Sequence, residues 1–280
     1  MASKLKPALS SASVRDALDG ATVAIAASGS PSARLDAELL LAHVLGVDRA
    51  ALYARPEAPV EGPAVRAFQD LVRRRGVGRE PVAYLLGARA FRRIELAVDR
   101  RVLIPRPETE LVVEAVLERA APGARVVDVG TGSGAIALAL KDERPDLDVI
   151  GSDVSADALA VARANGERLG LDVSWRQVDL VPEGLDPPAD VVASNPPYVR
   201  DGDELMPDVA RHEPPLALYG GADGLDVIRR LLAARPPLLV LEVGEGQARA
   251  VAALAERAGF AGGEVLRDLA GIERVVVAWT

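Results

Sequence analysis

The chain has no cysteine among its 280 residues, which excludes disulfides, thiol catalysis and cysteine-ligated zinc or iron–sulfur sites. Only two histidines are present, His43 and His212, so a metal site built from several histidines is excluded as well. We therefore expect no metal, and any chemistry must use other side chains.

Long apolar runs are also missing, because no stretch approaches the roughly 18 to 20 apolar residues that a membrane-spanning helix requires. The apolar segment 21–27 is short and follows Asp16 and Asp19, a poor match to the basic and then apolar pattern of a secretion signal. We expect a cytoplasmic protein that is not embedded in a membrane.

Basic charge is scarce in the larger part of the chain. Residues 91–280 carry 21 Lys or Arg against 32 Asp or Glu, whereas residues 1–90 carry 12 against 9, and the formal net charge is −8. An acidic surface repels a phosphate backbone, so we expect no stable binding of nucleic acid. At roughly 150 residues per domain, the length predicts two domains.

Apolar residues recur at spacings of three and four between Val14 and Leu86, and no strand pattern interrupts them. One helix is marked by Leu35, Leu39, Leu40, His43 and Val44, and another by Val65, Phe68, Leu71 and Val72, closed by Gly76. We predict a small helical domain over residues 1–86, in which His43 lies in the core.

After Gly87 the period changes to two. Four apolar residues alternate with polar or small ones, as is typical of a half-buried hairpin: Phe91, Ile94, Leu96 and Val98. We predict that residues 87–107 form a hairpin linker. A helix is expected over residues 108–119, because its first turn carries acids that favour the helix dipole.

From residue 125 onward, short apolar runs alternate with helical patterns, which is typical of a doubly wound parallel sheet. The predicted strands are 125–129, 148–152, 173–178, 190–194, 238–243, 263–267 and 273–279. The predicted helices are 133–141, 156–169, 225–234 and 247–258. No helix separates the last two strands, so we expect them to pair antiparallel at one edge. The sequence thus predicts an α/β domain over residues 108–280.

A glycine-rich turn joins the first of these strands to its helix, where backbone N–H groups are free to touch a ligand. The turn reads Gly130, Thr131, Gly132, Ser133, Gly134. Asp128 precedes it, where a carboxylate would attract an ammonium group and repel a pyrophosphate. Asp153 ends the second strand, placed to accept hydrogen bonds from both hydroxyls of a ribose. S-adenosylmethionine carries both groups, so we predict it as the cofactor; NAD fits less well, and a purely structural turn is the remaining interpretation.

The fourth strand ends in the tetrad Asn195, Pro196, Pro197, Tyr198. The prolines remove two N–H donors and leave the Pro196 carbonyl as an unpaired acceptor beside the side-chain acceptor of Asn195. Two acceptors suit one planar NH₂ group, on which Tyr198 can stack. Such positioning helps a weakly nucleophilic amide or adenine nitrogen to attack a sulfonium methyl group, and no general base is needed. A bland Asn-Pro turn is the alternative interpretation.

These motifs resemble those of the release-factor glutamine methyltransferases (the PrmC/HemK family), within the class I S-adenosylmethionine-dependent methyltransferases. The resemblance covers nearly the whole chain and is carried by the cofactor loop 128–134, the tetrad 195–198 and, most distinctively, segment 103–110, Leu-Ile-Pro-Arg-Pro-Glu-Thr-Glu. Further agreement lies in residues 211–214, 241–247 and 267–274. The resemblance implies a Rossmann-like, seven-stranded class I methyltransferase sheet and methylation of the glutamine amide in the Gly-Gly-Gln motif of class I peptide chain release factors.

The resemblance also implies roles for individual residues. Cofactor contacts are expected from Asp128, Gly130, Thr131, Gly132, Ser133, Gly134, Leu180 and Asn195. Independently of the resemblance, Asp153 is expected to contact the cofactor from the end of the second strand, and Asp179 could reach the adenine amino group from the end of the third. Asn195, Pro196 and Tyr198 are expected to be catalytic, and Pro197 to line the substrate slot with them. The helical domain is expected to dock the release factor, with Arg73, Arg74, Arg75 and Arg79 facing acidic surface on it. A solvated turn acid at Asp179 and a solvated charged helix end at the arginines are the alternatives.

Two positions depart from the family pattern. Arg92 stands where many members carry a second aromatic residue, and Leu180 where some carry tryptophan beside the adenine. An adenine-N6 methyltransferase acting on nucleic acid shares the logic of the tetrad, but the acidic catalytic half disfavours it. A non-catalytic scaffold is disfavoured because Asp128, Asp153 and the tetrad are all present.

Overall fold

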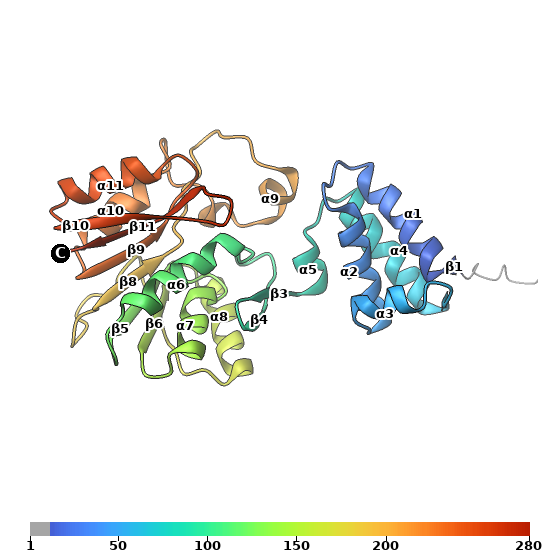
Figure 1. The fold of residues 1–280 in the computed structure, drawn as a ribbon, viewed down its shortest axis with the longest axis horizontal. Coiled ribbons are helices and arrows are strands. Elements are labelled where there is room, and N and C mark those ends of the chain that lie inside the picture. Colours follow the sequence, from blue (N-terminus) through green and yellow to red (C-terminus); the bar gives the residue numbers. More distant parts are fainter. Residues whose placement is uncertain (1–11) are drawn as a thin grey trace, which may run out of the picture. The chain divides into compact units, whose positions relative to one another are not determined.

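The computed structural model describes residues 12–280, so the first eleven residues of the predicted helical domain lie outside the described residues. The chain divides into two compact units (Figure 1). Of the described residues, the smaller unit comprises 12–87 together with Pro207–His212, and the larger unit comprises Ala88–Met206 and Glu213–Thr280. The hairpin that we expected as a linker therefore belongs to the larger unit. A short segment of the predicted domain 108–280 belongs to the smaller one.

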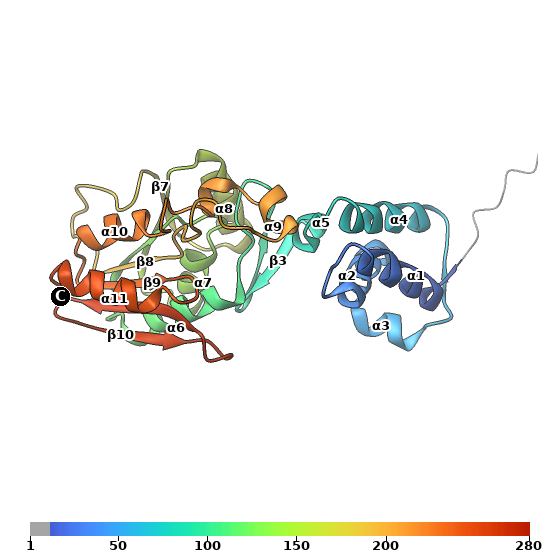
Figure 2. The ribbon, with the colours of Figure 1, turned by 90° about the horizontal axis from the view of Figure 1, so that it is seen from above.

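Helices make up most of the smaller unit, as the apolar spacing predicts. They are α1 (Val14–Ala26), α2 (Ala33–Leu45), α3 (Arg49–Ala54), α4 (Pro63–Gly76), α5 (Val82–Leu86) and α9 (Pro207–His212). Helices α1, α2 and α4 pack against one another (Figure 2) around a core that includes Ile25, Leu40, Leu41 and Phe68. The expectation of no strand here is wrong, because β1 (Ala12–Ser13) pairs antiparallel with β2 (Pro59–Val60).

The side chain of His43 is exposed, so its predicted place in the core is wrong. Helix α2 buries a face that begins with alanines, and its inward residues are Ala33, Ala37, Leu40 and Leu41. Four residues make slightly more than one turn, so this face leaves Leu35 and His43 on the solvent side. The predicted spacing counts only large apolar residues and His43, so it leaves out the small alanines of the buried face.

The predicted basic docking surface is also wrong for two of its four arginines. Arg75 and Arg79 are 5% and 7% exposed and form ion pairs inside the smaller unit. The Arg75 guanidinium donates to Asp36 (2.7 Å) and Asp208 (2.5 Å), and Arg79 donates to the other oxygen of Asp208 (2.5 Å). These charges are neutralised within the fold, and they attach helix α9 to α2 and α4.

A single seven-stranded sheet organises the larger unit, in the order β10-β11-β9-β8-β5-β6-β7. Its strands are β5 (Arg125–Val129), β6 (Asp148–Asp153), β7 (Ser174–Gln177), β8 (Val191–Ser194), β9 (Leu238–Glu242), β10 (Gly262–Arg267) and β11 (Glu273–Trp279). All neighbours pair parallel from β9 through β7, whereas β11 is antiparallel to both β9 and β10. The predicted doubly wound sheet with one antiparallel edge is confirmed.

Helices cover both faces of this sheet (Figure 1). They are α6 (Glu110–Arg119), α7 (Ala135–Glu143), α8 (Ala156–Leu169), α10 (Asp226–Ala233) and α11 (Ala248–Arg257), with 3-10 turns η1 (Pro107–Thr109) and η2 (Pro215–Ala217). Helices α10 and α11 pack on the face that carries Val127, Val129 and Leu241. No helix within residues 12–280 combines the length and apolar character that a membrane crossing needs.

The hairpin β3 (Ala88–Phe91) and β4 (Ile94–Ala97) buries its alternating apolar side chains as predicted. Its turn holds Arg92 at φ 49°, and the Arg92 guanidinium pairs with Glu143 of α7 and Glu114 of α6. The Arg92 N–H also donates to Glu110 Oε1 (3.1 Å). Ion pairs to two helices therefore hold the turn of the hairpin.

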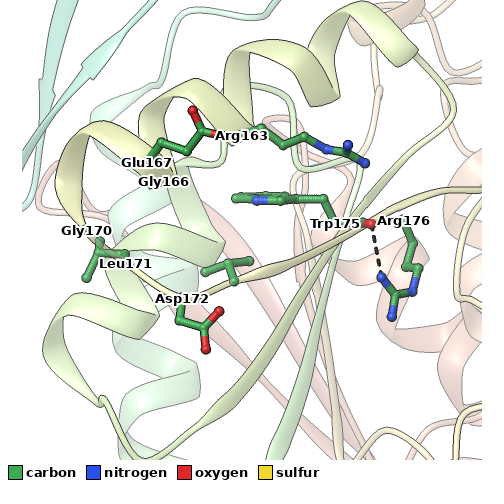
Figure 3. Close-up of a pocket in the computed structure, with 9 residues that line it drawn as sticks. Arg163, Gly166, Glu167, Gly170, Leu171, Asp172, Trp175 and Arg176 are labelled. Atoms are coloured by element: carbon green, nitrogen blue, oxygen red, sulfur yellow. Dashed lines mark hydrogen bonds between the residues drawn. The ribbon is translucent and has the colours of Figure 1, made fainter.

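Trp175 lies in β7, the edge strand at one end of the sheet, and packs against its neighbours (Figure 3). Its ring lies beneath α8 against Gly166, and it covers Gly151 of β6 so closely that a Cβ there would lie 2.4 Å from Cζ3 of the ring. A side chain at residue 151 would displace Trp175 and with it the edge strand β7. Glycine is thus required in β6, two residues before Asp153.

Candidate active site

A cavity of about 300 Å³ lies at the carboxyl ends of strands β5, β6 and β8. Its walls include the predicted residues Gly130, Gly132, Asp153, Asp179, Leu180, Asn195, Pro196 and Pro197. Thr131 and Ser133 line a smaller cavity of about 40 Å³ that shares Gly130, Gly132 and Asn195. Among the predicted residues, Asp128, Gly134 and Tyr198 line neither cavity. Because parallel strands end at the same edge of a sheet, residues far apart in sequence meet here.

Asp153 is oriented by the backbone around it. Its Oδ2 accepts a hydrogen bond from the Gly132 N–H (3.0 Å), and its Oδ1 accepts one from the Ser155 N–H (2.9 Å). The carboxylate therefore bridges the glycine-rich loop and the start of α8. Each carboxylate oxygen can accept a further bond, so Asp153 presents a fixed pair of acceptors in the cavity wall.

Asp128 is fully buried between the glycine-rich loop and the first turn of α7. Its Oδ2 accepts hydrogen bonds from the Thr131 hydroxyl (2.6 Å) and the Ala137 N–H (3.1 Å). Burial raises the pKa of Asp128 to about 7 against these two bonds. Its Oδ1 has no hydrogen-bond partner within residues 12–280. Because Asp128 lines neither cavity, a cationic ligand in the cavity would act on this carboxylate only through space, favouring its ionised form.

Asp179 and Leu180 follow β7 and reach the same cavity. The Arg230 guanidinium of α10 donates to Asp179 Oδ2 (2.6 Å), and both side chains are exposed. Leu180 adopts a positive φ of 68°, and its carbonyl accepts from the Ser152 hydroxyl (2.8 Å). Asp179 is therefore an ion-paired wall residue, and Arg230 is a neighbour that the sequence pattern did not single out.

A buried glutamate that sequence reasoning missed holds two other walls of the cavity together. Glu213 is 3% exposed and accepts hydrogen bonds from the Ile104 N–H (3.2 Å) and the Arg106 guanidinium (2.5 Å). Leu103 and Pro214, which flank these contacts in sequence, both line the cavity. Both segments belong to motifs that carry the family resemblance, which was the available signal.

The tetrad follows β8, and two contacts enclose its backbone. The Gln247 amide donates to the Tyr198 carbonyl (3.0 Å). Gly224 packs on that same carbonyl at φ 76°, and a Cβ on Gly224 would lie 2.2 Å from it. No donor among residues 12–280 reaches the Pro196 carbonyl. The tetrad backbone is thus fixed on one side and keeps a free acceptor at Pro196.

The side chains of the tetrad join a buried network. The Asn195 amide nitrogen donates to Thr109 Oγ1 (3.0 Å), and the Thr109 hydroxyl donates to Glu242 Oε2 (2.6 Å). The Tyr198 hydroxyl donates to Glu242 Oε1 (3.3 Å), and burial raises the pKa of Tyr198 well above its ordinary value. Thr109 and Glu242 were not predicted as site residues, although both lie in motifs that carry the resemblance.

The chain is similar to known proteins over nearly its whole length. Residues 16–87 match the family described as the PrmC N-terminal domain, and residues 107–212 match the methyltransferase small domain. A release factor glutamine methyltransferase from Geobacter sulfurreducens is 40% identical over 271 residues, covering 94% of this chain and 95% of its own. One from Deinococcus radiodurans is 41% identical over 274 residues, covering 95% and 98%. A solved methyltransferase from Pyrococcus furiosus, 16% identical, shares the fold with a TM-score of 0.51 over 66% of this chain and 87% of that one.

Proposed function

The chain belongs to the family of the release factor glutamine methyltransferases, and from that premise we propose that it methylates the side-chain amide nitrogen of a release-factor glutamine. The glutamine is that of the Gly-Gly-Gln motif in class I peptide chain release factors, and the cofactor is S-adenosylmethionine. The observation that carries the proposal is the pair of acceptors after β8, in the wall of the cavity that also contains Asp153.

The acceptor pair suits a primary amide. Asn195 uses its nitrogen for Thr109, which leaves Asn195 Oδ1 as an acceptor, and the Pro196 carbonyl is the second one. Two acceptors bind both N–H bonds of one NH₂ group and thereby fix the direction in which its nitrogen faces. They also stabilise positive charge that develops on that nitrogen when it forms a new bond. A glutamine amide has the required NH₂ group, and a glutamate carboxylate does not.

The other wall of the cavity suits the cofactor. S-adenosylmethionine, when bound, supplies a methyl group on a positively charged sulfur that leaves as a neutral thioether. Asp153 would accept from the ribose hydroxyls, since both of its oxygens are already oriented by the backbone. The unpartnered Oδ1 of Asp128 would favour the positive charge of the amino-acid end. Leu180 would contribute apolar contact at the adenine end of the cavity.

Methyl transfer from tritiated S-adenosylmethionine tests the proposal directly. We expect label in purified class I release factor, and none when its Gly-Gly-Gln glutamine is replaced by glutamate, because glutamate has no NH₂ group to hold. DNA and RNA are the comparison substrates, since an adenine methyltransferase would share the acceptor pair. Label in nucleic acid and none in the release factor would reject the proposal.

Asn195→Ala separates catalysis from cofactor binding. The variant removes one acceptor, so the amide can rotate about the remaining bond, and positioning losses of this kind cost on the order of 100-fold or more in rate. We expect kcat to fall by at least that factor while S-adenosylmethionine affinity, measured by calorimetry, changes by less than about tenfold. A variant that methylates release factor at near the wild-type rate would contradict the role of Asn195.

Docking by the smaller unit is a second part of the proposal. Contacts remote from the reacting amide serve only a large substrate, so KM for a short Gly-Gly-Gln peptide should exceed KM for the whole release factor. Kinetics with the intact enzyme and both substrates measure this difference. Equal KM values would leave the smaller unit without a docking role.

A further inference from the structure

Strand register brings Glu242 next to the tetrad. In the parallel pair β8 and β9, Ser194 lies opposite Leu241, so Asn195 and Glu242 are the next residues at the carboxyl end of each strand. Thr109 ends the turn η1, 133 residues before Glu242, and its hydroxyl lies between the two side chains. Glu242 and Thr109 are 1% and 3% exposed, so water does not replace either contact.

The direction of the hydrogen bonds in this chain is determined by the carboxylate. An ionised carboxylate only accepts, so Thr109 must give its single hydroxyl proton to Glu242. Thr109 Oγ1 can then only accept from Asn195, and it must therefore face the amide nitrogen. A reversed Asn195 amide would place two oxygens together with no proton between them. The Asn195 Oδ1 atom is left on the opposite side of the amide group.

We propose that Glu242, acting through the hydroxyl of Thr109, is a positioning residue that holds the Asn195 amide with its oxygen toward the substrate. This inference rests on the function proposed above. Neither Glu242 nor Thr109 touches the reacting atoms; their effect is to select one of two orientations of an amide that would otherwise be nearly isosteric. Only the selected orientation presents an acceptor to the glutamine NH₂ group.

Protonation of Glu242 would remove this selection. A carboxylic acid can donate to Thr109, which frees the Thr109 proton for Asn195 and permits the reversed amide. The groups that face Glu242 are Thr109 and Tyr198, which donate to it, the like charge of Glu108 and the opposite charge of Arg274. Burial raises the pKa of Glu242 to about 7 against the two hydroxyl bonds. The ionised form therefore increases as the pH rises through 7.

The first test compares two substitutions of Thr109. Thr109→Val keeps the volume and loses the hydroxyl, so we expect kcat on release factor to fall at least tenfold with S-adenosylmethionine affinity within about threefold of wild type. Thr109→Ser keeps the hydroxyl and should retain kcat within about threefold. Thr22→Val is the matched control, because the Thr22 hydroxyl donates only to the Leu18 carbonyl (2.7 Å) in α1. Thr109→Val activity within threefold of wild type, or equal losses in Val and Ser variants, would overturn the proposal.

The second test uses Glu242→Gln and the pH dependence of kcat at saturating cofactor, where ionisation of Asp128 no longer limits binding. A neutral amide cannot impose the carboxylate's direction, so we expect kcat of the variant to be at least tenfold below wild type at pH 8.5. The ratio of wild-type kcat to variant kcat should shrink toward pH 6, because wild-type Glu242 then becomes protonated. A ratio that stays constant from pH 6 to 8.5 would overturn the proposal, even if Thr109→Val proved too unstable to assay.

Wild-type enzyme separates this inference from the proposed function. If wild type fails to label the Gly-Gly-Gln glutamine of release factor, the proposed function fails and the positioning role fails with it. If wild type labels the glutamine and the Thr109 and Glu242 variants behave as wild type, only the positioning role fails.

Discussion

The strongest prediction about stability concerns Arg75. Its guanidinium is the shared cation of Asp36 and Asp208 and also donates to the Ser30 hydroxyl (3.0 Å). Arg75→Met replaces the arginine with an apolar side chain of similar length. It therefore leaves two carboxylates without their buried cation. Removing one partner of a buried ion pair costs about 3 to 5 kcal/mol, and Arg79 can compensate only at Asp208. We expect the smaller unit to lose stability in that range.

Two optical signals separate the smaller unit from the larger one. Both tryptophans of the chain, Trp175 and Trp279, lie in the larger unit, so their fluorescence reports only that unit, whereas circular dichroism reports helices in both. For a unit of this size, 3 kcal/mol corresponds to a fall in melting temperature of at least about 12 °C. We expect the circular dichroism of Arg75→Met to show an earlier transition, which is that of the smaller unit. The tryptophan transition of the larger unit should be retained.

Arg73→Met is the matched control for Arg75→Met, since Arg73 pairs with Asp70 at the surface, where both side chains are more than half exposed. Exposed pairs of this kind contribute little, so we expect no resolvable shift. A circular dichroism midpoint for Arg75→Met within about 4 °C of wild type, which corresponds to less than about 1 kcal/mol, would refute the reasoning. So would an equal effect in the two variants, because burial would then make no difference.

Two further predictions concern the cavity. Asp153→Ala removes the fixed pair of acceptors, and each charge-assisted hydrogen bond to them is worth about 1.5 to 3 kcal/mol. We therefore expect the affinity for S-adenosylmethionine, measured by calorimetry, to fall at least tenfold. Unchanged affinity would remove Asp153 from the cofactor site. Gly224→Ala places a Cβ within 2.2 Å of the Tyr198 carbonyl and is strained at φ 76°, so the tetrad must shift. We expect kcat to fall at least tenfold, with Gly123→Ala, also at positive φ but in open space, as the control; equal effects of the two would contradict displacement of the tetrad.

Local patterns in the sequence were sufficient for the elements of the larger unit. Strand β5 and helix α8 have the predicted bounds, because apolar runs and helical periodicity are properties of neighbouring residues. The convergence of the glycine-rich loop, Asp153 and Asn195 also followed, since parallel strands end at one edge of a sheet. These predictions needed only that the strands run parallel, which the alternation of strands and helices along the chain indicates.

Partners that are distant in sequence could not be predicted in this way. Thr109 and Glu242 meet across 133 residues, as do Arg75 and Asp208. Which buried polar groups meet depends on how helices and loops pack, and periodicity contains no information on that. The arginine cluster was therefore interpreted by composition as surface, whereas packing buries two of its members. The prediction for His43 was wrong for a different reason, because the buried face of α2 begins with the small residues Ala33 and Ala37 and leaves His43 on the solvent side.

Helix α9 makes the smaller unit discontinuous in sequence, because the chain enters it after the tetrad and leaves it before Glu213. A module attached at one terminus can be lost or exchanged by a single recombination event. Here such an event would leave 6 residues of the smaller unit inside the methyltransferase chain, with Asp208 separated from both of its arginines. Exchange of the whole unit requires three coordinated breakpoints, after Gly87, after Met206 and after His212, so the helical unit and the catalytic sheet are constrained to be inherited and to diverge together.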